Sequence, residues 1–107
     1  MAICPQAPER NAATAEKLRL EFPILSDHTN AYARSLRLVH ELPDELQDIY
    51  RGFGVDLAEV NGEDSWTLPI PTRIVVDRDG LVRDVQSDPD YTRRPEPADT
   101  VEILRLL

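Results

Sequence analysis

The segment that most constrains the fold is a proline-flanked strand followed by a turn and a second strand. Leu68-Pro69-Ile70-Pro71-Thr72 leads directly into Arg73-Ile74-Val75-Val76-Asp77. A proline cannot donate to a sheet ladder, so Pro71 is tolerated only at a strand's first residue or at an edge. Residues 77–80, Asp-Arg-Asp-Gly, are typical of a turn, and residues 81–85 are again rich in strand formers. The sequence therefore predicts an antiparallel hairpin of residues 72–76 with residues 81–85.

The rest of the chain alternates short strands and helices. Pro8 and Pro43 suit the first position of a helix, where a missing N–H costs nothing, and Ser26 or Asp27 can cap a helix after the second strand. Apolar residues at helical spacing predict two buried faces: Ala12, Ala15, Leu18 and Phe22 in one helix, and Leu46, Ile49, Tyr50 and Phe53 in another. The predicted elements are strands at 2–4 and 22–25, helices at 8–22, 29–36, 43–52 and from 96, and an irregular loop at 55–70. This order predicts an α/β fold.

Length and charge exclude several classes of function. The chain has 107 residues, the length of about one domain. Its 20 acidic and 12 basic residues give a net charge of −8, which repels phosphate backbones, so we expect no nucleic-acid partner. No apolar run approaches the roughly 20 residues that span a bilayer, and residues 1–5 lack the features of a signal peptide. We expect a cytoplasmic protein without a membrane partner.

Few side chains form a chemical motif. His28 and His40 lie too far apart in sequence for a metal pair, and we interpret both as structural. The acids of residues 77–80 belong to the turn rather than to a calcium loop. The pair Arg93-Arg94 could hold an anion or lie solvated. There is no nucleophile elbow and no glycine-rich phosphate loop, so the sequence predicts no metal and no cofactor.

Cys4 is the single redox candidate. It ends a predicted strand, and the helix that begins near Pro8 lies close in sequence, so the helix dipole can favour a thiolate there. A lone cysteine after an apolar dipeptide is also typical of a small buried hydrophobic residue. Both interpretations stay open.

Several short segments, in this order, resemble one known family. They are Ile3-Cys4-Pro5-Gln6, Thr14-Ala15-Glu16-Lys17, Phe22-Pro23-Ile24-Leu25-Ser26-Asp27, Asn61-Gly62 with Ser65-Trp66, Val75-Val76-Asp77-Arg78-Asp79-Gly80 and Asp90-Tyr91-Thr92-Arg93-Arg94. Together they resemble a peroxiredoxin-like branch of the alkyl hydroperoxide reductase/thiol-specific antioxidant (AhpC/TSA) family, over nearly the whole chain. The resemblance implies a thioredoxin-like fold in which the Ile70–Pro71 bond is cis and the proline faces the redox cysteine.

The chain also departs from that family's pattern. The peroxidatic Thr-x-x-Cys motif is missing, and the resemblance implies that its strand and helix would lie upstream of Met1. Pro71 stands at the place of the arginine that stabilises the thiolate, and Arg73 should point elsewhere. Cys4 stands where relatives prefer serine, so no resolving role transfers to it, and Arg37 stands where a helix-ending glycine is expected.

These observations predict a single, partial thioredoxin-like domain over residues 1–107, lacking the first core strand and the catalytic helix. The implied family activity is thiol-dependent peroxide reduction by an antioxidant oxidoreductase, and we expect this chain alone to be inactive and marginally stable. The alternative is a non-enzymatic protein-binding module derived from the same fold. Expected partners are a thiol reductant or thioredoxin-type protein, where the full domain is present, and further copies of the chain through exposed strand edges. We expect residues 2–4 to run parallel to residues 72–76, paired or across a gap.

Overall fold

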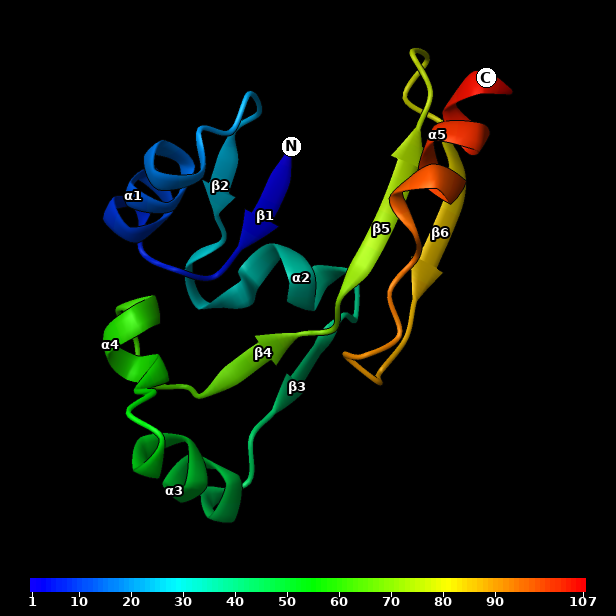
Figure 1. The fold of residues 1–107 in the computed structure, drawn as a ribbon. Helices are drawn as coiled ribbons and strands as arrows, with labels where there is room; N and C mark the ends of the chain where they lie inside the picture. The colour runs from blue at the N-terminus through cyan, green and yellow to red at the C-terminus, as the bar shows by residue number, and fades with distance from the viewer. The chain divides into compact units, whose positions relative to one another are not determined.

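A computed structural model describes all residues, 1–107, and shows two compact units, Met1–Pro69 and Ile70–Leu107 (Figure 1). A single domain over the whole chain stays a prediction. The strands form three two-stranded sheets, β1–β2, β3–β4 and β5–β6. None of the helices combines the length and the apolar character that a membrane crossing needs.

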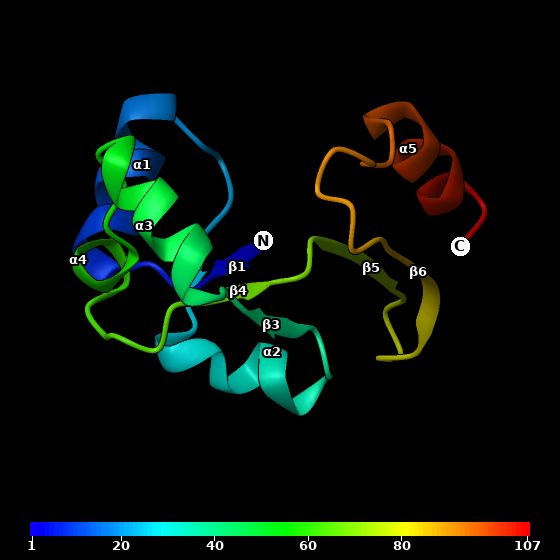
Figure 2. The ribbon, with the colours of Figure 1, turned by 90° about the horizontal axis from the view of Figure 1, so that it is seen from below.

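The first unit opens with a parallel β-α-β arrangement. Strand β1 (Ala2–Cys4) pairs with β2 (Ile24–Ser26), so that Cys4 lies opposite Ser26. Helix α1 (Pro8–Leu18) connects the two strands, and Figures 1 and 2 show it beside them. This confirms the predicted strand at residues 2–4 and the helix that begins at Pro8.

The second part of this unit contains more regular structure than the sequence predicted. It comprises a 3₁₀ turn η1 (His28–Asn30), α2 (Ala31–Ser35), β3 (Val39–Glu41), α3 (Asp44–Gly52), α4 (Leu57–Asn61) and β4 (Thr67–Pro69). Strand β3 pairs antiparallel with β4. The prediction of an irregular loop at 55–70 is therefore wrong. Helix α4 forms because Asp56 Oδ1 accepts the N–H of Ala58 at 3.0 Å, while Gly62 at φ +69° ends the helix.

Two buried polar side chains hold this part in place. Asp27 accepts the backbone N–H groups of Tyr32 (2.8 Å) and Ala33 (2.9 Å), so its carboxylate caps α2. Asn30 is completely buried, and its Nδ2 donates to the carbonyl (3.2 Å) and the Oγ1 (2.9 Å) of Thr67. The amide of Asn30 therefore ties η1 to β4.

The apolar core of the first unit is small. Leu42, Leu57 and Trp66 are buried, and Tyr50 and Leu68 pack against them.

Helix α3 does not bury the face that its apolar spacing predicted. Tyr50 is half-buried, but Leu46, Ile49 and Phe53 are 41%, 51% and 83% exposed. The reason is the rotation of the helix about its axis: Tyr50 packs against the core, while Gln47 donates its Nε2 to the Leu42 carbonyl at 2.9 Å.

The second unit is a hairpin with one helix. Strands β5 (Thr72–Val76) and β6 (Val82–Ser87) pair antiparallel with a bulge at Val75/Val76, which confirms the predicted hairpin. Helix α5 (Pro97–Arg105) lies over the hairpin face that carries Val75, whose exposure is 4% (Figure 2). The alternate residues of β5, Ile74 and Val76, are 42% and 47% exposed on the opposite face.

The expectation of a cis Ile70–Pro71 bond is wrong, because every peptide bond of the chain is trans. Trans is the lower-energy form of an X–Pro bond by about 0.5–1 kcal/mol, so cis needs neighbouring structure to enforce it. Strand β5 has β6 as its one partner, and Thr72 Oγ1 closes the local turn by donating to the Ile70 carbonyl at 2.9 Å. Within their own units, residues 2–4 pair with β2 and residues 72–76 pair with β6, and the expectation that the two segments run parallel, paired or across a gap, stays a prediction.

We predict that Arg37→Gly stabilises the protein. Arg37 follows the end of α2 with φ at +59°, the left-handed conformation that helix-ending glycines adopt. That conformation costs a residue with a Cβ about 1–2 kcal/mol. Glycine relieves this strain and loses more backbone entropy on folding, so we expect a net gain of about 0.5–1 kcal/mol in the free energy of unfolding by urea. Arg37→Ala, which keeps the strain, should give no such gain, and an equal gain in both variants would contradict the explanation.

A second prediction concerns the pH dependence of the hairpin. The backbone N–H of Leu81, followed by Arg83 Nε and the N–H of Asp79, donates to the Asp77 carboxylate and lowers its pKa below the ordinary value. A lowered pKa in the folded state contributes stability above the unfolded pKa, and this contribution is lost as the pH falls through the folded pKa. We expect urea unfolding to show a loss of stability below about pH 4 that is smaller in Asp77→Asn. Identical pH profiles would contradict the contribution of Asp77.

Candidate functional site

The redox candidate Cys4 lies at the end of β1, partly buried beside Ser26 of β2. Its Sγ donates to Asn11 Oδ1 of α1 at a sulfur–oxygen distance of 3.0 Å. Its carbonyl accepts the backbone N–H of Asp27 at 2.8 Å, which continues the β1–β2 pairing by one residue. The thiol is therefore part of the junction between the two strands and the helix.

Asn11 is the centre of this cluster, although no sequence motif pointed to it. The side chain is 3% exposed, and its Nδ2 donates to Ser26 Oγ at 2.8 Å and to the Gln6 carbonyl at 3.3 Å. These two donor bonds fix the orientation of the amide, so Oδ1 faces the sulfur of Cys4. The sequence did contain one signal for it. Asn11 lies four positions before Ala15, so it is a polar residue on the otherwise apolar side of the helix.

The cluster around the sulfur is electrically neutral. Its members are a thiol, an amide, a hydroxyl and a backbone carbonyl. The bond from Cys4 to Asn11 uses the thiol hydrogen, so it exists only while the sulfur is protonated. A sulfur that attacks a peroxide is a thiolate, and reactive cysteines lie at helix N-termini or beside lysine, arginine, histidine or a metal. The hydrogen bond of the Cys4 sulfur goes instead to the side-chain amide of Asn11, which carries no charge.

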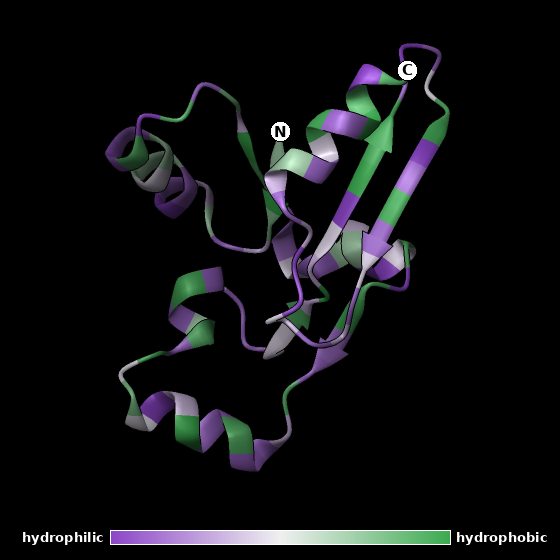
Figure 3. Ribbon diagram, turned by 45° about the vertical axis from the view of Figure 1, so that its right-hand side comes forward, coloured by the Kyte–Doolittle hydropathy of each residue, from purple (hydrophilic) through white to green (hydrophobic).

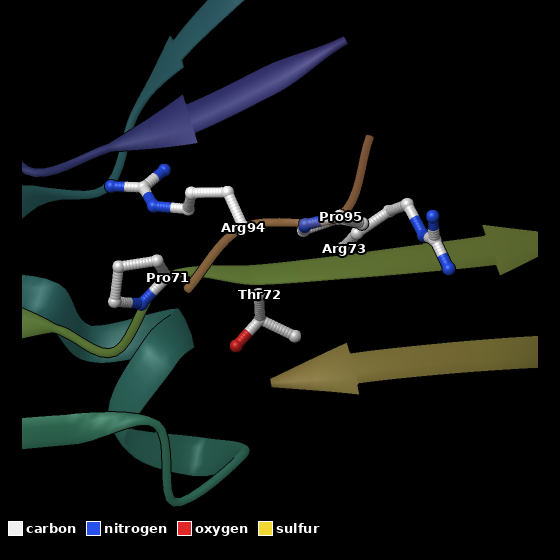
Figure 4. Close-up of a pocket in the computed structure, with 5 residues that line it drawn as sticks. All are labelled: Pro71, Thr72, Arg73, Arg94 and Pro95. Carbon is white, nitrogen blue, oxygen red and sulfur yellow. The ribbon is translucent and has the colours of Figure 1, made fainter. Parts of the chain in front are cut away.

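Pro71, the second predicted site residue, lies in the second unit. It lines a hollow of about 190 Å³ together with Thr72, Arg73, Arg94 and Pro95 (Figure 4). Figure 4 shows the guanidinium groups of Arg73 and Arg94 at opposite ends of this group of residues, so they do not converge on one point.

Arg73 binds within its own unit. Its Nη1 donates to Thr100 Oγ1 of α5 at 2.8 Å and its Nη2 donates to Asp84 Oδ2 of β6 at 2.6 Å. The side chain is 16% exposed and joins β5, β6 and α5. Arg73 therefore has a structural role in holding the helix to the hairpin.

The arginines of the pair Arg93-Arg94 also have local partners. Arg93 Nε lies 3.6 Å from Asp90 Oδ2, and Arg94 Nε donates to the Tyr91 carbonyl at 2.9 Å. Of the two interpretations left open for this pair, the structure favours locally satisfied, solvated side chains over an anion site.

Comparison with known proteins identifies the family. Residues 1–85 match the family model of the AhpC/TSA family, which spans more than half of the chain. The match confirms the resemblance seen in the sequence and the thioredoxin-like α/β fold class, here a partial one with small sheets. A search of curated proteins found no match.

We predict that Asn11→Ala both destabilises the protein and makes Cys4 more reactive. The substitution leaves the thiol, Ser26 Oγ and the Gln6 carbonyl without this partner, which costs about 1–3 kcal/mol in the free energy of unfolding. The rate at which Cys4 reacts with Ellman's reagent under native conditions should rise, because the sulfur is no longer held by the amide.

The matched control is Asn30→Ala, which removes an equally buried amide that does not contact Cys4. It should lower stability in the same way without a comparable rise in the thiol reaction rate. Equal acceleration in the two variants would show that general destabilisation, and not the bond to Asn11, governs the accessibility of Cys4.

Proposed function

The chain belongs to the AhpC/TSA family, and we propose that it is the non-peroxidatic part of a thiol-dependent peroxide-reducing domain and does not reduce peroxide by itself. In the reaction of such a domain, a cysteine thiolate attacks a peroxide oxygen and breaks the O–O bond. The products are a cysteine sulfenic acid and water or an alcohol. A second thiol then reduces the sulfenic acid by way of a disulfide.

One observation carries the proposal: Cys4 Sγ donates its hydrogen to Asn11 Oδ1. Loss of the thiol proton would remove this hydrogen bond and leave a negative sulfur 3.0 Å from an amide oxygen, which is also electron-rich. The amide cannot turn its nitrogen toward the sulfur without breaking its bonds to Ser26 and Gln6. The cluster thus gives the sulfur a structural hydrogen bond and contains no positively charged side chain.

The position of the thiolate-stabilising arginine leads to the same conclusion. By the resemblance to the AhpC/TSA family, Pro71 occupies the position of this arginine, and a proline side chain has no hydrogen-bond donor. Arg73, two residues further along β5, uses both terminal nitrogens on Asp84 and Thr100. The chain therefore offers no arginine at that position to activate a cysteine.

The expected setting of this function follows from the family reaction. We place the protein in the cytoplasm, as part of an antioxidant oxidoreductase. Its reductant would be a small thiol or a thioredoxin-type protein acting on the peroxidatic cysteine of the full domain. Each two-stranded sheet leaves outer strand edges with unpaired backbone groups, which supports association of copies of the chain through these edges.

The test is a peroxide-consumption assay with a thiol reductant. We expect the isolated chain and Cys4→Ser to consume hydrogen peroxide at the same rate as buffer with reductant alone, while an active thiol peroxidase in the same assay serves as the positive control. Turnover by the wild-type chain that disappears in Cys4→Ser would contradict the proposal, because it would make Cys4 a working nucleophile.

A further inference from the structure

Helix α3 exposes an apolar stripe. Leu46, Ile49 and Phe53 follow one another at steps of three and four residues and are 41%, 51% and 83% exposed. Figure 3 shows apolar and polar residues alternating along this helix. An amphipathic helix of a globular unit ordinarily turns such a stripe to the core.

The other side of α3 explains why the stripe is free. Gln47 donates to the Leu42 carbonyl, Tyr50 packs against the core, and the Arg51 guanidinium lies 4.6 Å from the centre of the Trp66 ring. These contacts fix the rotation of the helix, so the stripe cannot reach the core without losing them. Its exposure is a consequence of specific contacts on the opposite side.

The segment of the chain that contains the stripe is strongly acidic. Residues 41–64 contain one arginine and eight carboxylates, namely Glu41, Asp44, Glu45, Asp48, Asp56, Glu59, Glu63 and Asp64. The arginine, Arg51, is paired with Asp48 at 3.3 Å and lies over Trp66. Glu59 is paired with Arg10 of α1, also at 3.3 Å. This segment carries a net charge of −7, nearly the whole net charge of the protein, which is −8. We call the stripe together with these carboxylates the α3 surface.

We propose that the α3 surface binds a basic amphipathic helix of another protein. Apolar anchors at steps of three and four residues suit the apolar side of a helix, as in helix-in-groove recognition. Lysines and arginines at the border of such a partner helix would meet the carboxylates. This inference goes beyond the redox proposal and does not depend on it.

Charge also decides against the other occupants. A second copy would bring its own net charge of −7 against this one, and like charges facing each other oppose association. Anionic lipid surfaces and nucleic acids are repelled for the same reason.

The test is a binding titration with a synthetic peptide of leucine and lysine patterned as an amphipathic helix. Fluorescence anisotropy of the labelled peptide measures its affinity for the full chain. Two peptides serve as controls: a scrambled one of the same composition without an apolar side, and one with glutamate in place of lysine. We expect saturable binding of the patterned basic peptide alone, and weaker binding as salt screens the carboxylates.

Matched variants locate the binding site. Phe53→Ser should weaken binding by about tenfold, as expected for an aromatic anchor. Leu106→Ser, at a position that is 86% exposed in the second unit, should leave the affinity within about twofold. Glu45→Gln should weaken binding and reduce its salt dependence, whereas Glu21→Gln, outside residues 41–64, should change neither.

Circular dichroism checks that Phe53→Ser keeps the helical content of the wild-type chain. Ile49→Ser is a second variant that removes an apolar side chain of the stripe. Binding of the scrambled peptide with equal affinity would overturn the proposal, as would equal affinities of Phe53→Ser and Leu106→Ser. A concentration-dependent dimer that is lost in Phe53→Ser would overturn it as well, because the occupant of the stripe would then be a second copy.

Discussion

The side-chain amide of Asn11 is the interaction on which the amino-terminal part of the structure depends. This amide of α1 makes three hydrogen bonds. Its partners are the Cys4 thiol at the end of β1, the Gln6 carbonyl in the following loop and the Ser26 hydroxyl at the end of β2. Strands β1 and β2 have three residues each, too few to fix a helix by their own pairing. The hydrogen bonds of the Asn11 amide fix the helix, which the short strands cannot do alone. In one of these bonds the Cys4 thiol is the donor, so the thiol has a structural role. The same bond therefore explains the local fold and gives Cys4 a structural place in it.

Buried polar groups have a similar role elsewhere, since the apolar core is small. Leu42, Leu57, Trp66 and Val75 are the buried apolar side chains, whereas 21 large apolar residues are exposed. Elements of such a protein are positioned by directional bonds, through Asp27, Asn30 and Arg73 in addition to Asn11. Directional bonds fix geometry but leave apolar faces uncovered, as on α3 and on the open side of the hairpin.

The sequence predicted the elements whose causes are local. The hairpin follows from its turn and its strand formers, and α1 begins at Pro8 because proline suits the first helical position. Helix α4 was missed although its local signals, the capping Asp56 and the pair Asn61-Gly62, were present. Strands β3 and β4 could not be predicted from local signals, because each exists through its pairing with the other across more than twenty residues.

The exposed side of α3 and the candidate site at Cys4 could each be predicted only in part. In both, the sequence shows the side chains but not the contacts that they make. The spacing of Leu46, Ile49 and Phe53 shows which side of α3 is apolar, but not which side meets the core, since contacts of Gln47 and Arg51 decide that. The role of Cys4 as a redox candidate stays a prediction, since both of its interpretations were consistent with the sequence. Its partner Asn11 lies seven residues away, and the bond between them requires β1, α1 and β2 to be in place.

The central claim is that Cys4 is a structural thiol held by Asn11. Mass spectrometry of the intact chain after a short exposure to one equivalent of hydrogen peroxide, with a dimedone-type trap for sulfenic acid, tests it most directly. We expect the mass of the chain to stay unchanged under conditions that convert an active peroxidatic cysteine completely to the trapped adduct. Rapid formation of that adduct on the wild-type chain, with none on Cys4→Ser, would contradict the claim.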